Sequence, residues 1–191
     1  MRLPDLYYDP TKNFVYSLGG SAYQLNGYAY DFDVPVQLWG FQLDNGHANW
    51  ELQDTGPSQN FPLTSVVQHA LTATSPKGHY NLGGRVYSSS DVWIYLEEVV
   101  EFNFANQSWT NRTLSGQYSY GDAQFIPIFG QEGVVLFFGG DGSMSGLDNI
   151  LVYDIHTNMF YNQPATNAPL GRTSFCSVVA GTNSTNSSYE M

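Results

Sequence analysis

VVLFFGGDGSMSGLDNILVYDIHTNMF, residues 134–160, decides the fold. It contains an apolar run, a glycine pair, a polar loop and a second apolar run with alternating large side chains, and it ends on an aromatic residue. Alternation at period two is typical of β-strands, and a glycine pair before a polar loop is typical of a turn. One copy of this pattern would be an ordinary β-hairpin, so the decisive observation is whether it recurs.

The pattern recurs three times. Apolar runs end on a glycine pair at three places, and the pairs are Gly19 with Gly20, Gly83 with Gly84, and Gly139 with Gly140. A second apolar run follows each pair, and it contains one large aromatic residue, which is Phe41, Phe102 or Tyr153 in turn. A turn rich in Asn and Asp then leads to a closing aromatic residue, which is Trp50, Trp109 or Phe160 in turn. A further short apolar segment precedes each pair, and a fourth such segment, RTSFCSVVAGTN, begins at Arg172.

Each unit is therefore predicted to form four short strands, and no segment shows the period of a helix. A four-stranded antiparallel meander has two apolar faces, so repeated units must stack on one another to bury them. The predicted fold class is all-β, and the predicted architecture is a radial array of four-stranded sheets, a β-propeller.

In these residues the chain resembles the kelch-repeat propellers, including the galactose oxidase central-domain group, and most of all the secreted or membrane-anchored fungal kelch proteins. The resemblance rests on the glycine pairs and the closing aromatics, and it departs from the family where Phe160 replaces the usual Trp. It implies a single partial kelch-type β-propeller domain over 1–191. About three four-stranded antiparallel blades are expected, at about 3–56, 64–114 and 121–164, with the first strand of a fourth in about 170–191.

The same resemblance implies structural roles for the repeat signature. The glycine pair ends the second strand of a blade, where a side chain would collide with neighbouring backbone or require a positive φ. The closing aromatics Trp50, Trp109 and Phe160 are expected to open the outer strand and to pack between blades as core residues. Cys176, in the apolar run SFCSVV, is expected to be a buried and inert thiol.

Composition limits the partners that the chain can bind. The 191 residues include 6 Lys and Arg against 17 Asp and Glu, which gives a net charge of −11, and they contain no basic run that could neutralise phosphates. Nucleic acid is therefore not an expected partner. No stretch approaches the eighteen or so apolar residues that span a bilayer, so no direct membrane insertion by this segment is expected.

Four N-x-[ST] sequons are candidate N-glycosylation sites, and they are Asn106, Asn111, Asn183 and Asn186. They favour an extracellular or cell-surface location, although such tripeptides also arise by chance, and a cytoplasmic location stays open. The opening MRLPDLYYDP has no apolar h-region, so a signal peptide and any transmembrane anchor would lie outside this chain.

The sequence offers no constellation of residues for catalysis. No metal-ligand spacing relates the four histidines, His47, His69, His79 and His156. Galactose oxidases hold copper with His and Tyr and cross-link one Tyr to a Cys, but no Tyr motif lies beside Cys176. Glu97 and Glu98 would point to opposite faces of a strand, and turn chemistry accounts for Asp141 and Asp148. No catalytic residue, metal site or cofactor is predicted.

Surface recognition remains as the expected function. The loops between the second and third strands are rich in aromatic side chains, which give contact area at small entropic cost and stack on sugar rings. The candidate binding residues are Tyr23, Tyr28, Tyr30, Asp31, Asp33, Tyr87, Trp93 and Tyr95. The alternative interpretation is that these aromatics cap the hydrophobic edges of their own blades.

The hypothesis from the sequence is a kelch-repeat binding or scaffold module that recognises a protein or carbohydrate ligand and carries no catalysis in this segment. One alternative is a fragment of a galactose-oxidase-like copper radical oxidase, or of another propeller enzyme, whose active site lies outside this chain. Another is a structural spacer in a longer anchored protein. Because a closed ring typically needs four to eight blades, the chain is expected to be a fragment, or to self-associate so that two copies close a six-bladed ring.

Overall fold

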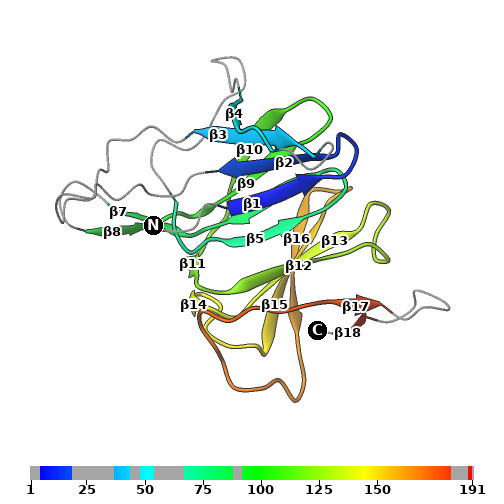
Figure 1. The fold of residues 1–191 in the computed structure, drawn as a ribbon. Helices are drawn as coiled ribbons and strands as arrows, with labels where there is room; N and C mark the ends of the chain where they lie inside the picture. Colours follow the sequence, from blue (N-terminus) through cyan, green and yellow to red (C-terminus); the bar gives the residue numbers. More distant parts are fainter. Residues whose placement is uncertain are drawn as a thin grey trace.

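The computed structural model describes residues 5–18, 37–43, 48–53, 67–87, 92–181 and 189–190. These residues form strands and turns and include no helix, so the all-β prediction is confirmed. In the same ranges no helix has the length and hydropathy needed to cross a membrane. Sheets of four antiparallel strands make up most of the described chain (Figure 1).

The strands of each large sheet follow one another in chain order. The first sheet contains β1 (Asp5–Asp9), β2 (Phe14–Leu18), β3 (Leu38–Gln42) and β4 (Glu51–Leu52). The second contains β5 (Leu71–Thr74), β6 (Gly78–Leu82), β9 (Glu98–Asn103) and β10 (Ser108–Thr113). The third contains β12 (Asp122–Ile126), β13 (Val134–Phe138), β15 (Asn149–Asp154) and β16 (Met159–Pro164). The prediction of four-stranded antiparallel meanders is therefore confirmed.

Three short two-stranded pairings accompany these sheets in the described chain. They are β7 (Arg85–Tyr87) with β8 (Trp93–Tyr95), β11 (Tyr118–Ser119) with β14 (Asp141–Gly142), and β17 (Ala180–Gly181) with β18 (Tyr189–Glu190). The β7–β8 hairpin lies between β6 and β9 in the chain, and β14 lies between β13 and β15. In the second and third sheets, the segments that join the second and third strands are thus partly strand, not only loop.

Asp and Asn side chains shape the turns within the sheets. The Oδ1 atoms of Asp9, Asn103 and Asp154 each accept a hydrogen bond at 2.9 Å from the backbone N–H two residues ahead. This local bond is that of an Asx-turn, which replaces the hydrogen bonds that the backbone gives up where the strand ends. The Asn- and Asp-rich motifs of the sequence therefore correspond to a defined turn chemistry.

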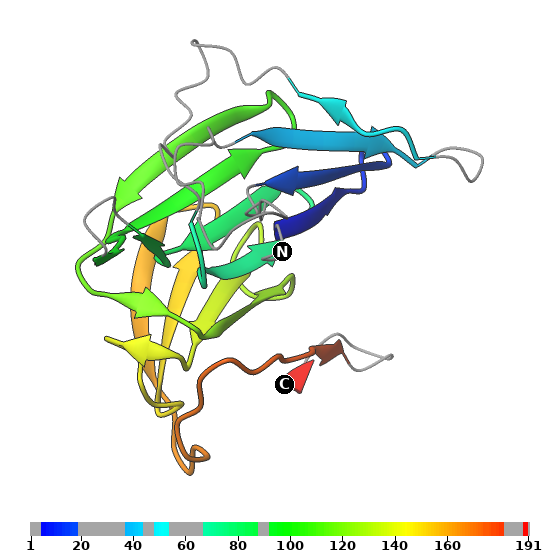
Figure 2. The same cartoon turned by 60° about the vertical axis from the view of Figure 1, so that its left-hand side comes forward.

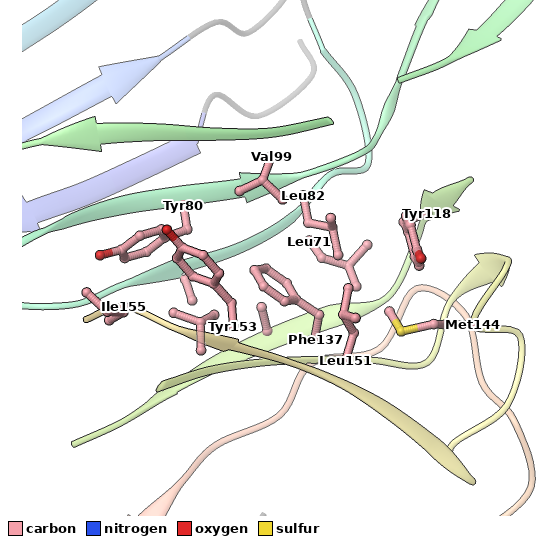
Figure 3. Packing of buried hydrophobic residues seen from close by; sticks show 13 residues of the cluster. Leu71, Tyr80, Leu82, Val99, Tyr118, Phe137, Met144, Leu151, Tyr153 and Ile155 are labelled. Carbon is pink, nitrogen blue, oxygen red and sulfur yellow. The ribbon is translucent and has the colours of Figure 1, made fainter. Parts of the chain in front are cut away.

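The three large sheets lie one after another in sequence order, and two apolar clusters hold them together (Figure 2). The cluster between the first and second sheets contains Tyr7, Tyr16, Leu18, Leu38, Val100, Phe102, Phe104 and Trp109. The cluster between the second and third sheets contains Leu71, Ala73, Tyr80, Leu82, Val99, Tyr118, Ala123, Val135, Phe137, Met144, Leu151, Tyr153 and Ile155 (Figure 3). Alternation along β9 sends Val99 into one cluster and Val100 into the other, so the second sheet is buried on both faces.

The glycine pairs join one sheet to the next. Gly83 and Gly84 have φ of 60° and 86°, and Gly139 and Gly140 have φ of 65° and 97°, a region that favours glycine. The second glycine of each pair donates its N–H across to the next unit, from Gly84 to the Tyr118 carbonyl (2.7 Å) and from Gly140 to the Arg172 carbonyl (2.8 Å). The pair Gly19 and Gly20 lies outside the described residues.

The closing aromatics differ in burial. Trp109 is 3% exposed and Phe160 is half-buried, but Trp50 is 47% exposed, so the prediction that Trp50 is a core residue is wrong. The reason lies in the stacking direction. Trp109, together with Phe102 of β9, faces the first sheet, whereas no described sheet covers the corresponding face where Trp50 packs on Phe41 with ring centroids 4.5 Å apart.

Cys176 is also misplaced by the sequence analysis, because its thiol is exposed. The described residues 171–179 form no strand, and they are held beside β12 by side-chain bonds. Gln124 donates from Nε2 to the carbonyl oxygen of Ser177 at 2.9 Å, and Ser177 donates from its backbone N–H to Asp122 at 2.5 Å. Without a partner strand to pair with, this segment does not enclose the thiol.

His79 is a structural residue between the first and second sheets. Its ring stacks on that of Tyr7 with centroids 4.1 Å apart and an angle of 6°, and its Nδ1 lies 2.9 Å from the hydroxyl oxygen of Thr74. Burial lowers the pKa of His79 to about 3, so the imidazole is neutral in the folded chain.

We expect this buried imidazole to make stability fall in acid. The unfolded chain protonates His79 below about pH 6.5 but the folded chain does so only near 3, so stability is lost as the pH falls through this window, by about 1.4 kcal/mol per unit. Between about pH 7 and about pH 4.5, the free energy of unfolding in urea should fall by about 3 kcal/mol more in the wild type than in His79→Phe. Burial raises the pKa of Asp5 to about 6, which makes stability rise as the pH falls. This opposite effect is the same in the wild type and in His79→Phe, so it does not change the difference between them. Parallel pH profiles for the two proteins would contradict this assignment.

Candidate functional site

Three residues at one end of the sheets share an unusual backbone conformation. His69, Tyr120 and Ser174 have φ of 60°, 59° and 54°. His69 and Tyr120 each lie two residues before the first strand of a large sheet, and Ser174 lies in the segment that follows the third sheet. Backbone hydrogen bonds connect them in a row, from Tyr120 N–H to the His69 carbonyl (2.9 Å) and from Ser174 N–H to the Tyr120 carbonyl (2.8 Å).

A positive φ is strained for side chains as large as those of His69 and Tyr120. The left-handed region is uncommon for residues other than glycine, and it costs on the order of 1–3 kcal/mol when a bulky residue occupies it. Such strain persists where the surrounding structure enforces it, and it concentrates at functional sites. The row formed by His69 and Tyr120 is therefore a candidate functional site.

Four side chains stack at this place. The His69 ring lies on the Tyr120 ring with centroids 4.0 Å apart and an angle of 23°. The Arg85 guanidinium carbon lies 4.6 Å from the Tyr120 ring centroid and 4.1 Å from that of Trp93, and Arg85 Nη2 donates to the Tyr120 hydroxyl oxygen. We call His69, Tyr120, Arg85 and Trp93 the Arg85 stack.

The backbone fixes the position of Arg85. Gln68, next to His69, forms an isolated antiparallel bridge with Arg85, in which each N–H donates to the other carbonyl at 2.9 Å. On the other side Arg85 pairs with Tyr95 in the β7–β8 hairpin. The guanidinium is therefore held from the second sheet, while Tyr120 comes from the entry to the third.

The charge environment of Arg85 differs from that of three other cations in the described residues. Lys12, Lys77 and Arg112 each form an ion pair with a carboxylate. In the described part of the chain, the partners of the Arg85 side chain are two aromatic rings and a phenol oxygen, and its buried Nε has no hydrogen-bond partner. Cation–π contacts of this kind contribute about 0.5–2 kcal/mol each, depending on solvent access.

The structure places only some of the residues proposed from the sequence. Trp93 belongs to the Arg85 stack, and Tyr95 lies opposite Arg85 in the hairpin and is half-buried. Tyr87 pairs with Trp93 through its backbone, but its side chain is not described. The remaining candidates, Tyr23, Tyr28, Tyr30, Asp31 and Asp33, lie outside the described residues.

Sequence reasoning missed three members of the stack, His69, Arg85 and Tyr120. Arg85 directly follows a glycine pair, and His69 and Tyr120 hold the same place relative to the first strand of successive units. Alignment of the units to one another would have singled out these positions. In the sequence, His69 has no neighbouring residue at metal-ligand spacing, so the pattern of histidines does not single it out.

Other polar candidates are separate from the stack. Asn106 and Asn111 are exposed, whereas Asn183 and Asn186 lie outside the described residues. His156 is exposed and lies 3.6 Å from Glu132, and His47 is not described. Within the described ranges, no group of three or more His, Cys, Asp or Glu side chains could hold a metal ion.

Comparison with known proteins gives a match at the level of fold. No protein-family model matches the sequence, and no curated protein matches it. The solved structure of YjhT superimposes with a TM-score of 0.55 at 12% sequence identity, over 87% of this chain and 53% of that chain. At this identity the similarity shows the fold alone, and the chain spans about half the length of the YjhT structure.

Proposed function

We propose that this chain is part of a kelch-type β-propeller that acts as a binding module for a protein or glycan partner. The Arg85 stack and the β7–β8 hairpin form the binding end. The observation that carries the proposal is the stack itself, in which four side chains that hydrogen-bond and stack are gathered on strained and hydrogen-bonded backbone.

The exposed face of the first sheet supports a larger ring. Five large hydrophobic side chains are exposed in this sheet on the face away from the second sheet, namely Leu6, Tyr8, Trp39, Trp50 and Leu52. Apolar faces of this kind mark contact surfaces, and here a further sheet of the same type would bury them. The similarity to about half of YjhT is in keeping with this interpretation.

The chemistry of the stack supports recognition. Trp, Tyr and Arg are the residue types that most often carry binding energy at interfaces, and a rigid scaffold that presents them from its ends loses little entropy on binding. The candidate Trp93 lies in a short hairpin, and neither apolar cluster of the sheets contains it. Replacement of Trp93 therefore removes no side chain from either of these two clusters.

An extracellular location and N-glycosylation are part of the proposal. Asn106 and Asn111 are exposed, as acceptor residues must be. Peptide mass spectrometry of the chain secreted from a eukaryotic host tests the proposed glycosylation. We expect glycans on Asn106 and Asn111, and unmodified peptides at both positions would contradict it.

The binding function is tested with glycan and protein microarrays probed with three proteins. They are the wild type, Trp93→Ala, and the matched aromatic control Phe129→Ala. Phe129 is 54% exposed in the turn between β12 and β13, at the other end of the sheets from the β7–β8 hairpin (Figure 1). We expect Trp93→Ala to weaken binding about tenfold or more, while Phe129→Ala binds as the wild type does.

Thermal melts separate binding from stability in this test. Both variants should melt within a few degrees of the wild type, because neither side chain belongs to a core cluster. Equal binding by all three proteins would place recognition elsewhere on the chain. A preparation that binds nothing but contains copper and oxidises sugars in its full-length form would favour the oxidase alternative.

A further inference from the structure

We infer that the Arg85 stack recognises a single carboxylate group on the partner. This inference rests on the proposed binding function and deepens it, because it names the chemical group that the stack takes. It follows from the geometry of the guanidinium, from the charges around it and from the rigidity of the backbone that holds it.

The described contacts of the guanidinium leave the N–H groups of Nη1 and one N–H of Nη2 for a ligand, whereas Nε is buried. The Trp93 ring lies 4.1 Å from the guanidinium carbon and the Tyr120 ring 4.6 Å from it, and one N–H of Nη2 is bonded to the Tyr120 oxygen. An arginine has five N–H donors, and Tyr120 is the one acceptor that this side chain has in the described residues. Parallel N–H groups along a guanidinium edge match the two oxygens of a carboxylate.

The positive charge of Arg85 favours an anionic ligand, and the negative net charge of the chain favours a monoanion over a dianion. Arg85 is half-buried and has no carboxylate partner in the described residues, although the chain carries 17 Asp and Glu. A ligand carboxylate would supply a counter-charge that the described residues do not. The net charge of −11 repels a dianion about twice as strongly as a monoanion, which favours a carboxylate over a phosphate monoester.

The stack is also organised before a ligand arrives. Two bonds of 2.9 Å fix Arg85 to Gln68, and a third fixes Tyr120 to His69. The carbonyl oxygen of the Gln68 side chain, Oε1, is buried without a hydrogen-bond partner, as is Arg85 Nε, so the polar groups here are not fully satisfied by one another. The guanidinium itself is held by the Tyr120 oxygen and by the rings of Tyr120 and Trp93, so it loses little conformational entropy when it binds, and a small carboxylate is a sufficient probe.

The test uses two pairs of small molecules that differ only in the carboxylate. Methyl β-D-glucuronide is compared with methyl β-D-glucoside, and N-acetylglutamate amide with N-acetylglutamine amide. NMR titrations are made with the wild type, with Arg85→Gln, and with Tyr120→Phe, which keeps the ring but removes the oxygen that holds the guanidinium. We expect the acid of at least one pair to bind about tenfold or more tightly than its neutral partner, and Arg85→Gln to abolish this preference.

The outcomes separate this inference from the proposed function. Equal binding of acid and neutral partner at the stack would overturn the carboxylate inference and leave the binding function in place. A preference for the acid that survives in Arg85→Gln would place the carboxylate elsewhere, and failure of all four molecules to bind would also overturn the inference. The pair that shows the preference identifies the source as glycan or protein. If Arg85→Gln does not melt cooperatively, Tyr120→Phe serves as the test of the carboxylate inference. We expect this variant to lose severalfold in its preference for the acid over the neutral partner.

Discussion

Trp109→Ala should lower the free energy of unfolding by about 3–5 kcal/mol. Trp109 is 3% exposed, belongs to the cluster between the first and second sheets, and packs on Phe102 with ring centroids 4.6 Å apart. Its removal would leave a large cavity between two rigid sheets, which cannot close without moving one of them. Urea unfolding followed by circular dichroism measures the loss.

Trp50→Ala is the matched control for this prediction. Both tryptophans close a repeat unit, but Trp50 is 47% exposed and contacts Phe41 on a face that no described sheet covers. We expect its replacement to cost about 1 kcal/mol or less, because little buried area is lost. Similar losses at Trp50 and Trp109 would mean that both faces of the first sheet are covered in solution, contrary to the structure.

Gly140→Ala should destabilise the chain by about 3 kcal/mol or more. Gly140 has φ of 97°, and a Cβ there would collide with the carbonyl oxygen of Ser119 and lie 2.5 Å from the amide nitrogen of Gly121. These are backbone atoms that cannot rotate away. The change would also disturb the bond from Gly140 N–H to the Arg172 carbonyl, which ties the end of β13 to the segment after the third sheet.

Gly130→Ala separates the cost of the backbone angle from the cost of the collision. Gly130 also has a positive φ, of 69°, but a Cβ there would meet nothing closer than 3.5 Å, on the side chain of Asp154. Its replacement should cost about 1–2 kcal/mol, the price of the left-handed conformation alone. If the two alanine variants melt at the same temperature, close packing at the glycine pair does not hold the sheets together.

The sequence was sufficient for the parts of the fold that depend on local pattern. Period-two runs, Asn- and Asp-rich turns and glycine pairs each act over a few residues, and their recurrence predicted antiparallel sheets of four strands in chain order. The same pattern could not show that the segments between second and third strands contain the β7–β8 hairpin, since three-residue strands carry almost no periodic signal.

Burial was harder to predict because it depends on neighbouring sheets. Trp50 and Trp109 occupy the same place in their units, yet one is exposed and the other buried, because only Trp109 has a sheet opposite it in the described chain. Cys176 lies in an apolar run, but no strand in the described residues pairs with its segment, and the thiol is exposed. In both cases the local sequence is the same as that of a core residue.

The Arg85 stack shows the same limit for the candidate site. Trp93 was proposed from the aromatic content of its segment, whereas His69, Arg85 and Tyr120 were missed because the stack joins residues from two sheets. What brings them together is the row of backbone bonds between successive units, which no single motif contains. Position within the repeat, and not residue type, is the signal that would have found them.

The most direct test of the account is a map of backbone amide chemical shifts on binding, made with methyl β-D-glucuronide and with the best-bound molecule from the microarrays. We expect the largest changes at residues 68–70, 85–86, 93–95 and 118–121, which surround the Arg85 stack. Largest changes in the turns at the opposite end, residues 127–132 and 155–158, would contradict it, because the partner would then contact the end of the sheets that lacks the stack.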